Sequence, residues 1–354
     1  MKTVAKKVAT LLIVLFAVMF VFQGCVPPEI ESTKLYLQKK QYDHAEEQAR
    51  LAVEKYPANP MGYFYLGKVL YEKGDFKGMV EAFNKAKELK LDAKNAAEAD
   101  KYIKSSFAQN YNAAVKYVNQ AQSIDDSVKQ LELFKEAYEF AYNAYYCDPN
   151  YFPTYNILFR LGIQLGKKDE AHKLMKESVQ KFGDNDTLLY YVGIGYLSLG
   201  ENNEAEEIFK KAHDINPANS EVIKALVDIY VERSDFQHAQ ELLKTLVEKE
   251  PENPQILYLA AATFYNQKQY TEAAIYFEKL VQLVPDNKDY LEFYAIALIQ
   301  SNQASKAAEV LEANMSKFEN DPDIWQQYAV ALLKAGRVDD AKKANAKAKE
   351  LRGE

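Results

Sequence analysis

The strongest constraint on the fold is a residue pattern that recurs every 34 residues along most of the chain. Its clearest copy consists of Leu189, Val192, Gly193, Tyr196, Ala205, Phe209, Ala212 and Pro217. Unit starts fall near residues 152, 186, 220, 254, 288 and 322 without insertion or deletion, and two further units start near 26 and 60. Because the shared residues recur in phase, composition alone cannot produce the pattern, and the chain is a repeat protein.

Each half of a unit has the pattern of an amphipathic helix. Apolar residues at i, i+3, i+4 and i+7 predict helices of about 14 residues. Small residues such as Gly193 and Ala205 let the two helices of a unit approach closely. Glycines that suit a helix C-cap stand where the first helix should end: Gly74, Gly166, Gly200 and Gly336. One such helix pair exposes most of its apolar face, so its stability requires stacking on neighbours.

The pattern resembles the tetratricopeptide repeat, a helix pair with an apolar–small pair on its first helix and a small residue where the helices touch. That small residue is alanine in eight units, and Met79 replaces it in the ninth. The alanines are Ala45, Ala137, Ala171, Ala205, Ala239, Ala273, Ala307 and Ala341. The resemblance implies an all-α fold: a right-handed superhelical solenoid of antiparallel helix pairs, about nine units in residues 25–354.

One unit is longer than the others. The spacing between the starts at 60 and 118 is 58 residues, and no Gly or Pro occurs between Gly78 and Pro149. A continuous apolar stripe occupies Ile103, Phe107, Tyr111, Ala114, Val118 and Ala121. We expect a helix over 95–123, a turn capped by Asp125 or Asp126, and a return helix to 147, an extended hairpin around 94–148. It can be a docking prong, a harmless insertion, or an irregular hairpin broken near Ser105–Ser106.

Residues 1–24 have the organisation of an export signal. Basic residues precede Val8–Phe22, an apolar stretch that is short for a bilayer span. The stretch leads to Gly24 and Cys25, which resemble the lipobox of bacterial lipoproteins, although Phe22-Gln23 depart from it. The resemblance implies that Cys25 carries a lipid and that residues 1–24 are removed. The alternative is an uncleaved signal anchor, and either way the body is held at a membrane and faces the periplasm or exterior.

Composition and motifs disfavour two classes of function. The formal charge is −7 and no long run of Lys or Arg occurs, which argues against nucleic acid as a partner. No Gly-rich phosphate loop or known hydrolase motif is present. The histidines at 44, 172, 213 and 238 lie in different units, and Cys147 is predicted to be a buried or idle thiol. We therefore expect no enzyme activity, no metal site and no cofactor.

The resemblance places partner binding in a groove lined by the first helix of each unit. Its columns are Phe64 and Lys68, Asn156 and Arg160, Tyr190 and Ile194, Lys224 and Asp228, Tyr258, Ile296, Gln326 and Val330. Among these, Phe64, Tyr190, Ile194, Tyr258 and Ile296 are the candidate site residues, because they suggest an apolar, aromatic trough for a helix or extended segment. The competing interpretation is that they face the filled interior of a tight superhelix.

Together these features predict a scaffold or adaptor lipoprotein that binds protein partners of the cell envelope, most simply at the outer membrane. The alternative is a surface lipoprotein that captures a small ligand or glycan, because exposed tyrosines can stack on sugars. The two functions differ in partner class, protein against small molecule, and the residues alone do not decide between them.

Overall fold

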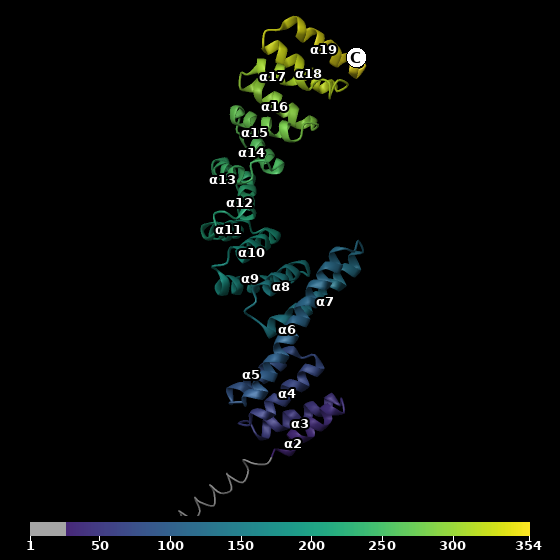
Figure 1. The fold of residues 1–354 in the computed structure, drawn as a ribbon, viewed down its shortest axis with the longest axis vertical. Helices are drawn as coiled ribbons and strands as arrows, with labels where there is room; N and C mark the ends of the chain where they lie inside the picture. The colour runs from purple at the N-terminus through teal and green to yellow at the C-terminus, as the bar shows by residue number, and fades with distance from the viewer. Residues whose placement is uncertain (1–25) are drawn as a thin grey trace, which may run out of the picture. The chain divides into compact units, whose positions relative to one another are not determined.

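The computed structural model describes residues 26–354, where eighteen α-helices and no strand occur (Figure 1). The expected all-α solenoid of antiparallel helix pairs with one extended hairpin is confirmed. The expected signal peptide over residues 1–24 and Cys25 lie outside the described residues. The described part of the chain divides into two compact units, with the boundary between residues 181 and 182.

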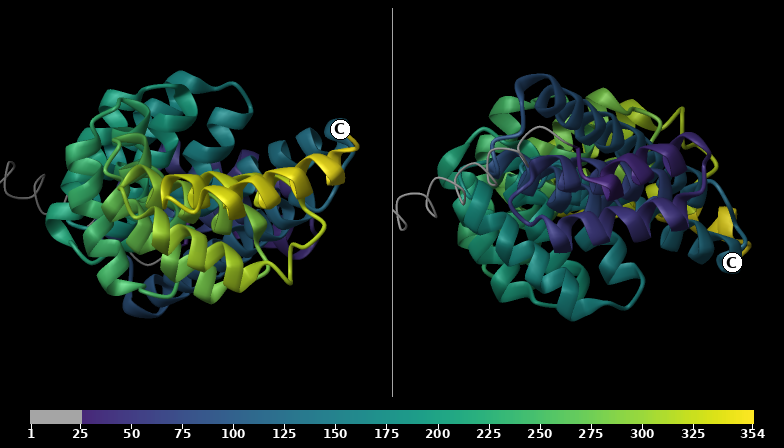
Figure 2. Two further views of the ribbon diagram at one scale, coloured as in Figure 1. Left: turned by 90° about the horizontal axis from the view of Figure 1, so that it is seen from above. Right: turned by 90° about the horizontal axis from the view of Figure 1, so that it is seen from below.

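The first unit contains four helix pairs. Its helices are α2 (Pro28–Gln38), α3 (Tyr42–Lys55), α4 (Pro60–Lys73), α5 (Phe76–Glu88), α6 (Ala93–Gln122), α7 (Ser127–Cys147), α8 (Phe152–Gln164) and α9 (Lys168–Phe182). In the right-hand view of Figure 2 the purple helices at the N-terminal end of this unit lie side by side.

The second unit contains five helix pairs of nearly uniform length. Its helices are α10 (Asp186–Leu199), α11 (Asn202–Ile215), α12 (Ser220–Glu232), α13 (Phe236–Lys249), α14 (Pro254–Asn266), α15 (Tyr270–Leu283), α16 (Lys288–Gln300), α17 (Ala304–Asn314), α18 (Pro322–Lys334) and α19 (Val338–Arg352). The yellow pair α18 and α19 lies at the C-terminal end (Figures 1 and 2).

Small residues bring the two helices of a pair into contact. Every residue in the alanine column, Met79 included, is at most 6% exposed. At Gly193 the approach is close, because a Cβ atom there would lie 2.5 Å from Cε1 of the Phe209 ring. The ring itself is fully buried. The apolar–small pattern on the first helix is therefore a packing requirement, since the aromatic ring of the second helix occupies the space above the glycine.

Caps mark the boundaries of the first helices. In the second unit, Asn185, Asn219, Asn253, Asn287 and Asp321 each accept hydrogen bonds from backbone N–H groups of the helix that follows. After the first helices, Gly74, Gly166, Gly200 and Gly336 have positive φ, as their sequence positions predict. Non-glycine residues hold the same conformation at the equivalent positions: Lys40, Ser234, Lys268 and Asn302.

The extended hairpin is the α6–α7 pair. Helix α6 is continuous over 30 residues, so the sequence alternative of a break near Ser105–Ser106 is wrong. Ser106 is fully buried, and its Oγ donates to Sδ of Met79 on α5 at 3.8 Å. At the turn, Asp126 caps α7 by accepting from the N–H groups of Val128 and Lys129.

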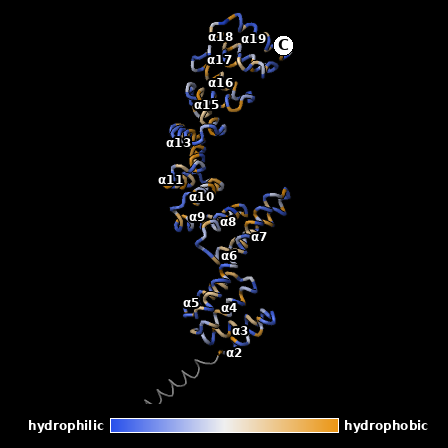
Figure 3. Tube along the Cα trace, in the orientation of Figure 1, coloured by the Kyte–Doolittle hydropathy of each residue, from blue (hydrophilic) through white to orange (hydrophobic). Residues whose placement is uncertain are grey.

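Hydrophobic and hydrophilic residues alternate along the helices in Figure 3. This distribution is that of stacked amphipathic helices, each of which buries one stripe. Within residues 26–354, no helix combines the length and the apolar character that a membrane crossing requires.

Candidate partner-binding surfaces

Four of the five predicted groove residues lie on first helices of the second unit. Tyr190 and Ile194 are on α10, Tyr258 is on α14 and Ile296 is on α16. Tyr258 is 41% exposed, and the other three side chains are half-buried. The ring of Tyr258 lies 5.7 Å from that of Tyr290 on α16. These residues therefore present partly exposed aromatic and aliphatic surface on the helices expected to carry it.

The four residues do not converge on one pocket. The α12–α13 pair separates α10 from α14 in the chain, so a ligand that touched both Tyr190 and Tyr258 would have to be extended. The ring of Tyr190 packs near the rings of Tyr191 and Phe209, with centroid distances of 5.4 Å and 6.1 Å. These contacts explain why the Tyr190 side chain is only partly exposed.

Phe64 corrects the sequence prediction. It is 1% exposed and therefore contributes no surface to a groove. Its ring lies 5.8 Å from that of Phe83 on α5, and the Lys68 Nζ atom lies 5.4 Å from its centre. Lys68 is held there by an ion pair of 2.8 Å with Glu98 of the long helix α6. Phe64 is buried because it packs in the hydrophobic core of the first unit, and the Lys68–Glu98 pair, whose two residues are 30 positions apart, lies beside it.

Asp228 is the acidic member of the predicted columns, on α12. Its side chain is exposed to water yet flanked by protein, and the partial loss of water raises the pKa of its carboxyl group. Lys224, one turn earlier, pairs with Glu221 at 3.2 Å. Asp228 therefore gives the α12 surface an acidic group at the repeat position that Ile194, Ile296 and Val330 occupy on other first helices of the second unit.

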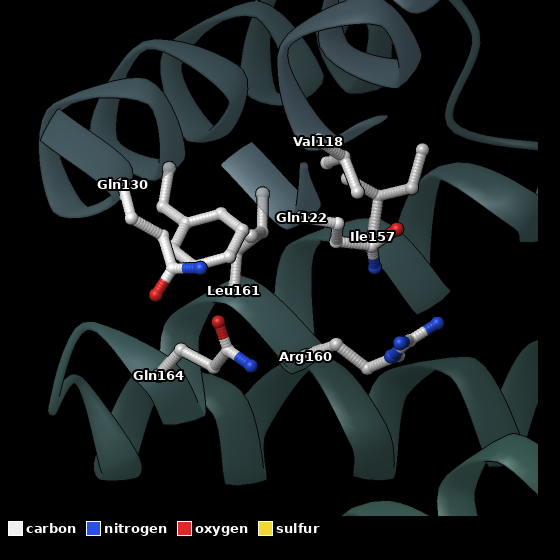
Figure 4. Close-up of a pocket in the computed structure, with 8 residues that line it drawn as sticks. Val118, Gln122, Gln130, Ile157, Arg160, Leu161 and Gln164 are labelled. Carbon is white, nitrogen blue, oxygen red and sulfur yellow. The ribbon is translucent and has the colours of Figure 1, made fainter. Parts of the chain in front are cut away.

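A pocket of about 270 Å³ lies in the first unit, between the α6–α7 hairpin and α8 (Figure 4). Its apolar lining is Val118, Phe134, Ile157 and Leu161, and its polar lining is Gln122, Gln130, Arg160 and Gln164. We call these eight residues the hairpin pocket. In Figure 4 the amide groups of Gln130 and Gln164 point toward one another at one side, and the Arg160 guanidinium extends from the other. Sequence reasoning placed Arg160 on a first-helix column but did not identify this pocket.

Two carboxylates fix the hairpin against the next pair. Glu170 on α9 accepts hydrogen bonds from the hydroxyls of Tyr138 (2.8 Å) and Tyr142 on α7. Two turns further on, Glu177 accepts from Tyr145 of α7 and from Tyr155 of α8, each at 2.9 Å. The hydrogen bond from Tyr142 is the main reason that the pKa of Glu170 is lowered. This tyrosine–glutamate ladder holds one wall of the hairpin pocket at a fixed place.

The described residues offer little chemistry. Cys147 is buried, and burial raises the pKa of its thiol to about 12, as expected of an idle thiol. Two histidines do have carboxylate neighbours, which the sequence analysis did not anticipate: His238 lies 2.7 Å from Asp235 and His44 lies 3.8 Å from Glu47. Both pairs are exposed. Across residues 26–354, no group of three or more candidate ligands could hold a metal ion.

Three family models match parts of the chain. A tetratricopeptide-repeat model matches residues 34–97, and the model of the cytochrome c-type biogenesis protein H tetratricopeptide domain matches 175–291. The model of the anaphase-promoting complex, cyclosome, subunit 3 matches 266–347. No curated protein matches the chain.

Several solved structures resemble the chain over about half of its length. YrrB, described as a tetratricopeptide protein with an unusual peptide-binding site, is 13% identical; the match covers 51% of this chain and 93% of YrrB, with a TM-score of 0.43. A MamA protein structure is 20% identical, with 49% and 94% covered and a TM-score of 0.41. MamA from Desulfovibrio magneticus is 19% identical, with 48% and 96% covered and a TM-score of 0.39.

The family models match both units, and both contain stacked helix pairs built on one 34-residue pattern. Proteins built from such repeats are protein-interaction scaffolds. The chain is a tetratricopeptide-repeat protein.

Proposed function

We propose that this scaffold is membrane-tethered, has no catalytic activity, and assembles partner proteins of the cell envelope on the first helices of its repeats. The observation that carries the proposal is the exposed apolar surface on those helices in the second unit. Tyr258 exposes 41% of its surface. A charged side chain at the same position would avoid this exposed apolar surface without loss of stability, so the tyrosine favours a binding role. Ile194 on α10 and Ile296 on α16 add half-buried apolar side chains on two other first helices.

The membrane and envelope parts of the proposal rest on residues 1–25. The basic start, the apolar stretch and Gly24-Cys25 support export and lipid attachment at Cys25. With its lipid in the outer membrane, the body would face the periplasm or the exterior. The lipid would hold the repeats near the membrane, where envelope proteins are available as partners.

Partner capture tests the scaffold directly. Tagged full-length protein is cross-linked in its native membranes, purified and analysed by mass spectrometry. We expect an envelope protein in near-stoichiometric amount that is lost when Tyr258→Lys removes the exposed aromatic surface. The matched control is Ile275→Lys, which changes a 53% exposed residue on the second helix α15 and should leave the partner bound. Equal capture by wild type and Tyr258→Lys would refute the role of this surface.

Fractionation tests the tether. We expect Cys25→Ser to leave the membrane fraction if the N-terminal segment is cleaved and lipidated. Retention of Cys25→Ser in the membrane with an uncleaved N-terminus would instead identify a signal anchor. Release of both wild type and variant into the soluble fraction would contradict membrane attachment altogether.

The second candidate is capture of a small ligand or glycan. The observation that favours it is the pair of neighbouring rings Tyr258 and Tyr290, because exposed tyrosine faces can stack on sugars. A glycan array with wild type and Tyr258→Lys tests it. Binding of a defined sugar that depends on Tyr258, together with no partner in the cross-linking experiment, would favour this function over the scaffold.

A further inference from the structure

The hairpin pocket is built from the three successive helices α6, α7 and α8, and we infer that it binds a carboxylate adjacent to an apolar side chain on a partner polypeptide. The inference rests on the proposed function, because it assumes a protein partner, and it adds the chemistry of one contact. It concerns the first unit, whereas the surface tested above lies in the second.

The apolar lining accepts a side chain. Phe134 and Leu161 are 8% and 4% exposed and form the best-buried part of the lining. A pocket of about 270 Å³ is slightly smaller than the roughly 300–1,000 Å³ of sites for whole small-molecule ligands. Its size therefore suits one or two residues of a longer ligand. Near the same end of the hairpin, Val128 and Leu131 on α7 are 67% and 42% exposed and offer further apolar surface.

Arg160 selects the charge of the ligand. The chain has five arginines, and in the described structure four of them form ion pairs with carboxylates: Arg50, Arg233, Arg337 and Arg352. Arg160 has no ion pair within residues 26–354, and no acidic residue lines the pocket. Arg160 is exposed, and its guanidinium beside the apolar lining can bind a carboxylate through two parallel hydrogen bonds together with its charge.

The glutamines favour a polypeptide over a fatty acid. Gln130 donates one amide hydrogen to the carbonyl of Ala121 at 2.9 Å, which leaves its own carbonyl available. Gln122 and Gln164 are exposed, and both carry donors and acceptors. A peptide backbone next to the bound residue has N–H and C=O groups that match these amides. The tail of a fatty acid has neither.

The carboxylate can come from two sources, the free C-terminus of a partner or the side chain of an internal Asp or Glu. Three fluorescein-labelled peptides on one Gly-Ser spacer distinguish them. The first ends in Leu with a free carboxylate, the second ends in Leu with a carboxamide, and the third has an internal Leu-Glu pair and a carboxamide end. Companion sets replace Leu by Val or Phe.

Binding to the full-length protein in detergent is measured by fluorescence anisotropy at low salt, up to about 1 mM protein, where weak complexes become visible. We expect one of the two carboxylate peptides to bind at least about tenfold more tightly than the neutral peptide. The tighter of the two identifies the source. Arg160→Gln should abolish the tenfold difference and leave the neutral peptide unaffected.

Two further variants complete the test. Gln164→Glu places a carboxylate one turn after Arg160 on α8, and by pairing with the guanidinium it should weaken binding as Arg160→Gln does. Lys104→Gln removes the same charge from an exposed position of α6 outside the pocket lining and should change nothing. Circular dichroism verifies that each variant keeps its helix content.

Three outcomes would overturn the inference: equal affinity for neutral and carboxylate peptides, equal weakening of all peptides by Arg160→Gln, or no saturable binding of any peptide. These outcomes differ from failure of the proposed function. If one of the three occurs and the wild type still captures the Tyr258-dependent partner in native membranes, the scaffold stands and only the pocket assignment falls.

Discussion

Gly193 offers a quantitative test of how closely the helices of one repeat pack. Alanine in place of glycine within a helix gains about 1 kcal/mol from reduced backbone entropy. At Gly193, however, the new Cβ would lie 2.5 Å from Cε1 and 2.6 Å from Cζ of Phe209, where carbon atoms prefer roughly 3.5–4.0 Å. The ring is fully buried, so it can move only by displacing its neighbours.

Overpacking of this kind costs about 1–3 kcal/mol. The 2.5 Å approach puts Gly193 in the upper half of this range, about 2–3 kcal/mol, so after subtraction of about 1 kcal/mol of helix gain we expect Gly193→Ala to destabilise the α10–α11 pair by about 1–2 kcal/mol. The protein supplies an internal comparison: Ala261 and Phe277 occupy the equivalent positions of the α14–α15 pair, where both are buried.

The control is Gly162→Ala on α8. There the new Cβ would meet the Cβ of Ala171 at 3.4 Å and nothing nearer, so the helix gain should dominate. Hydrogen exchange read by mass spectrometry is the suitable assay, because a solenoid need not unfold as one cooperative unit. Peptides from α10 and α11 should exchange about 5–30 times faster in Gly193→Ala, and those from α8 should be unchanged or slower in Gly162→Ala. Slower exchange in α10 and α11 of Gly193→Ala would refute the packing argument.

Other perturbations follow from the caps, the ladder and the cysteine. Lys268→Gly should slow hydrogen exchange of α14 and α15 and stabilise them by about 0.5–1 kcal/mol, because φ is +58° at Lys268; faster exchange would contradict this. Asn253→Ala should cost about 1 kcal/mol through loss of the α14 N-cap, seen as faster exchange in the first turn of α14. Because the pKa of Glu170 is lowered in the folded state, its contribution to stability is present above the unfolded pKa and is lost as the pH falls through the folded value. Acidification should therefore lower the protection of α7 and α9, measured relative to the intrinsic exchange rate at each pH, and Tyr142→Phe should weaken that pH dependence. In Cys25→Ser protein, Cys147 should react with a thiol reagent only after denaturation, and rapid reaction of the native protein would show that the thiol is accessible.

The helices and their order could be predicted from the sequence because local signals determine them. Apolar periodicity, capping residues and glycines with positive φ all act within a few residues, and the chain repeats them in phase. For the same reason, the helix predicted over residues 95–123 agrees closely with α6, which spans residues 93–122. The caps of the second unit were recognisable too, since an Asn or Asp precedes each of its first helices.

The binding surfaces were harder to predict because their properties depend on contacts between helices. Phe64 occupies the same repeat position as Tyr190 and Tyr258, yet it is buried next to the Lys68–Glu98 pair, and nothing near Phe64 in the sequence indicates this. The hairpin pocket combines residues from α6, α7 and α8. The sequence also could not predict that Arg160 forms no ion pair within residues 26–354. Arginine ion pairs in this protein reach across helices: Arg233 and Arg352 each pair with a carboxylate on another helix, 27 and 29 residues away.

The tyrosine–glutamate ladder has a mechanical consequence. Its two carboxylates are seven residues apart on α9, and Tyr138 and Tyr145 are seven apart on α7, so both steps correspond to nearly two helical turns. Sliding α7 along α9 by half a turn, about 2.7 Å, would break every rung between the two helices at the same moment. The hairpin can thus resist an axial pull as a unit. A partner that pulls on its turn would transmit the load to the α8–α9 pair before the hairpin slips.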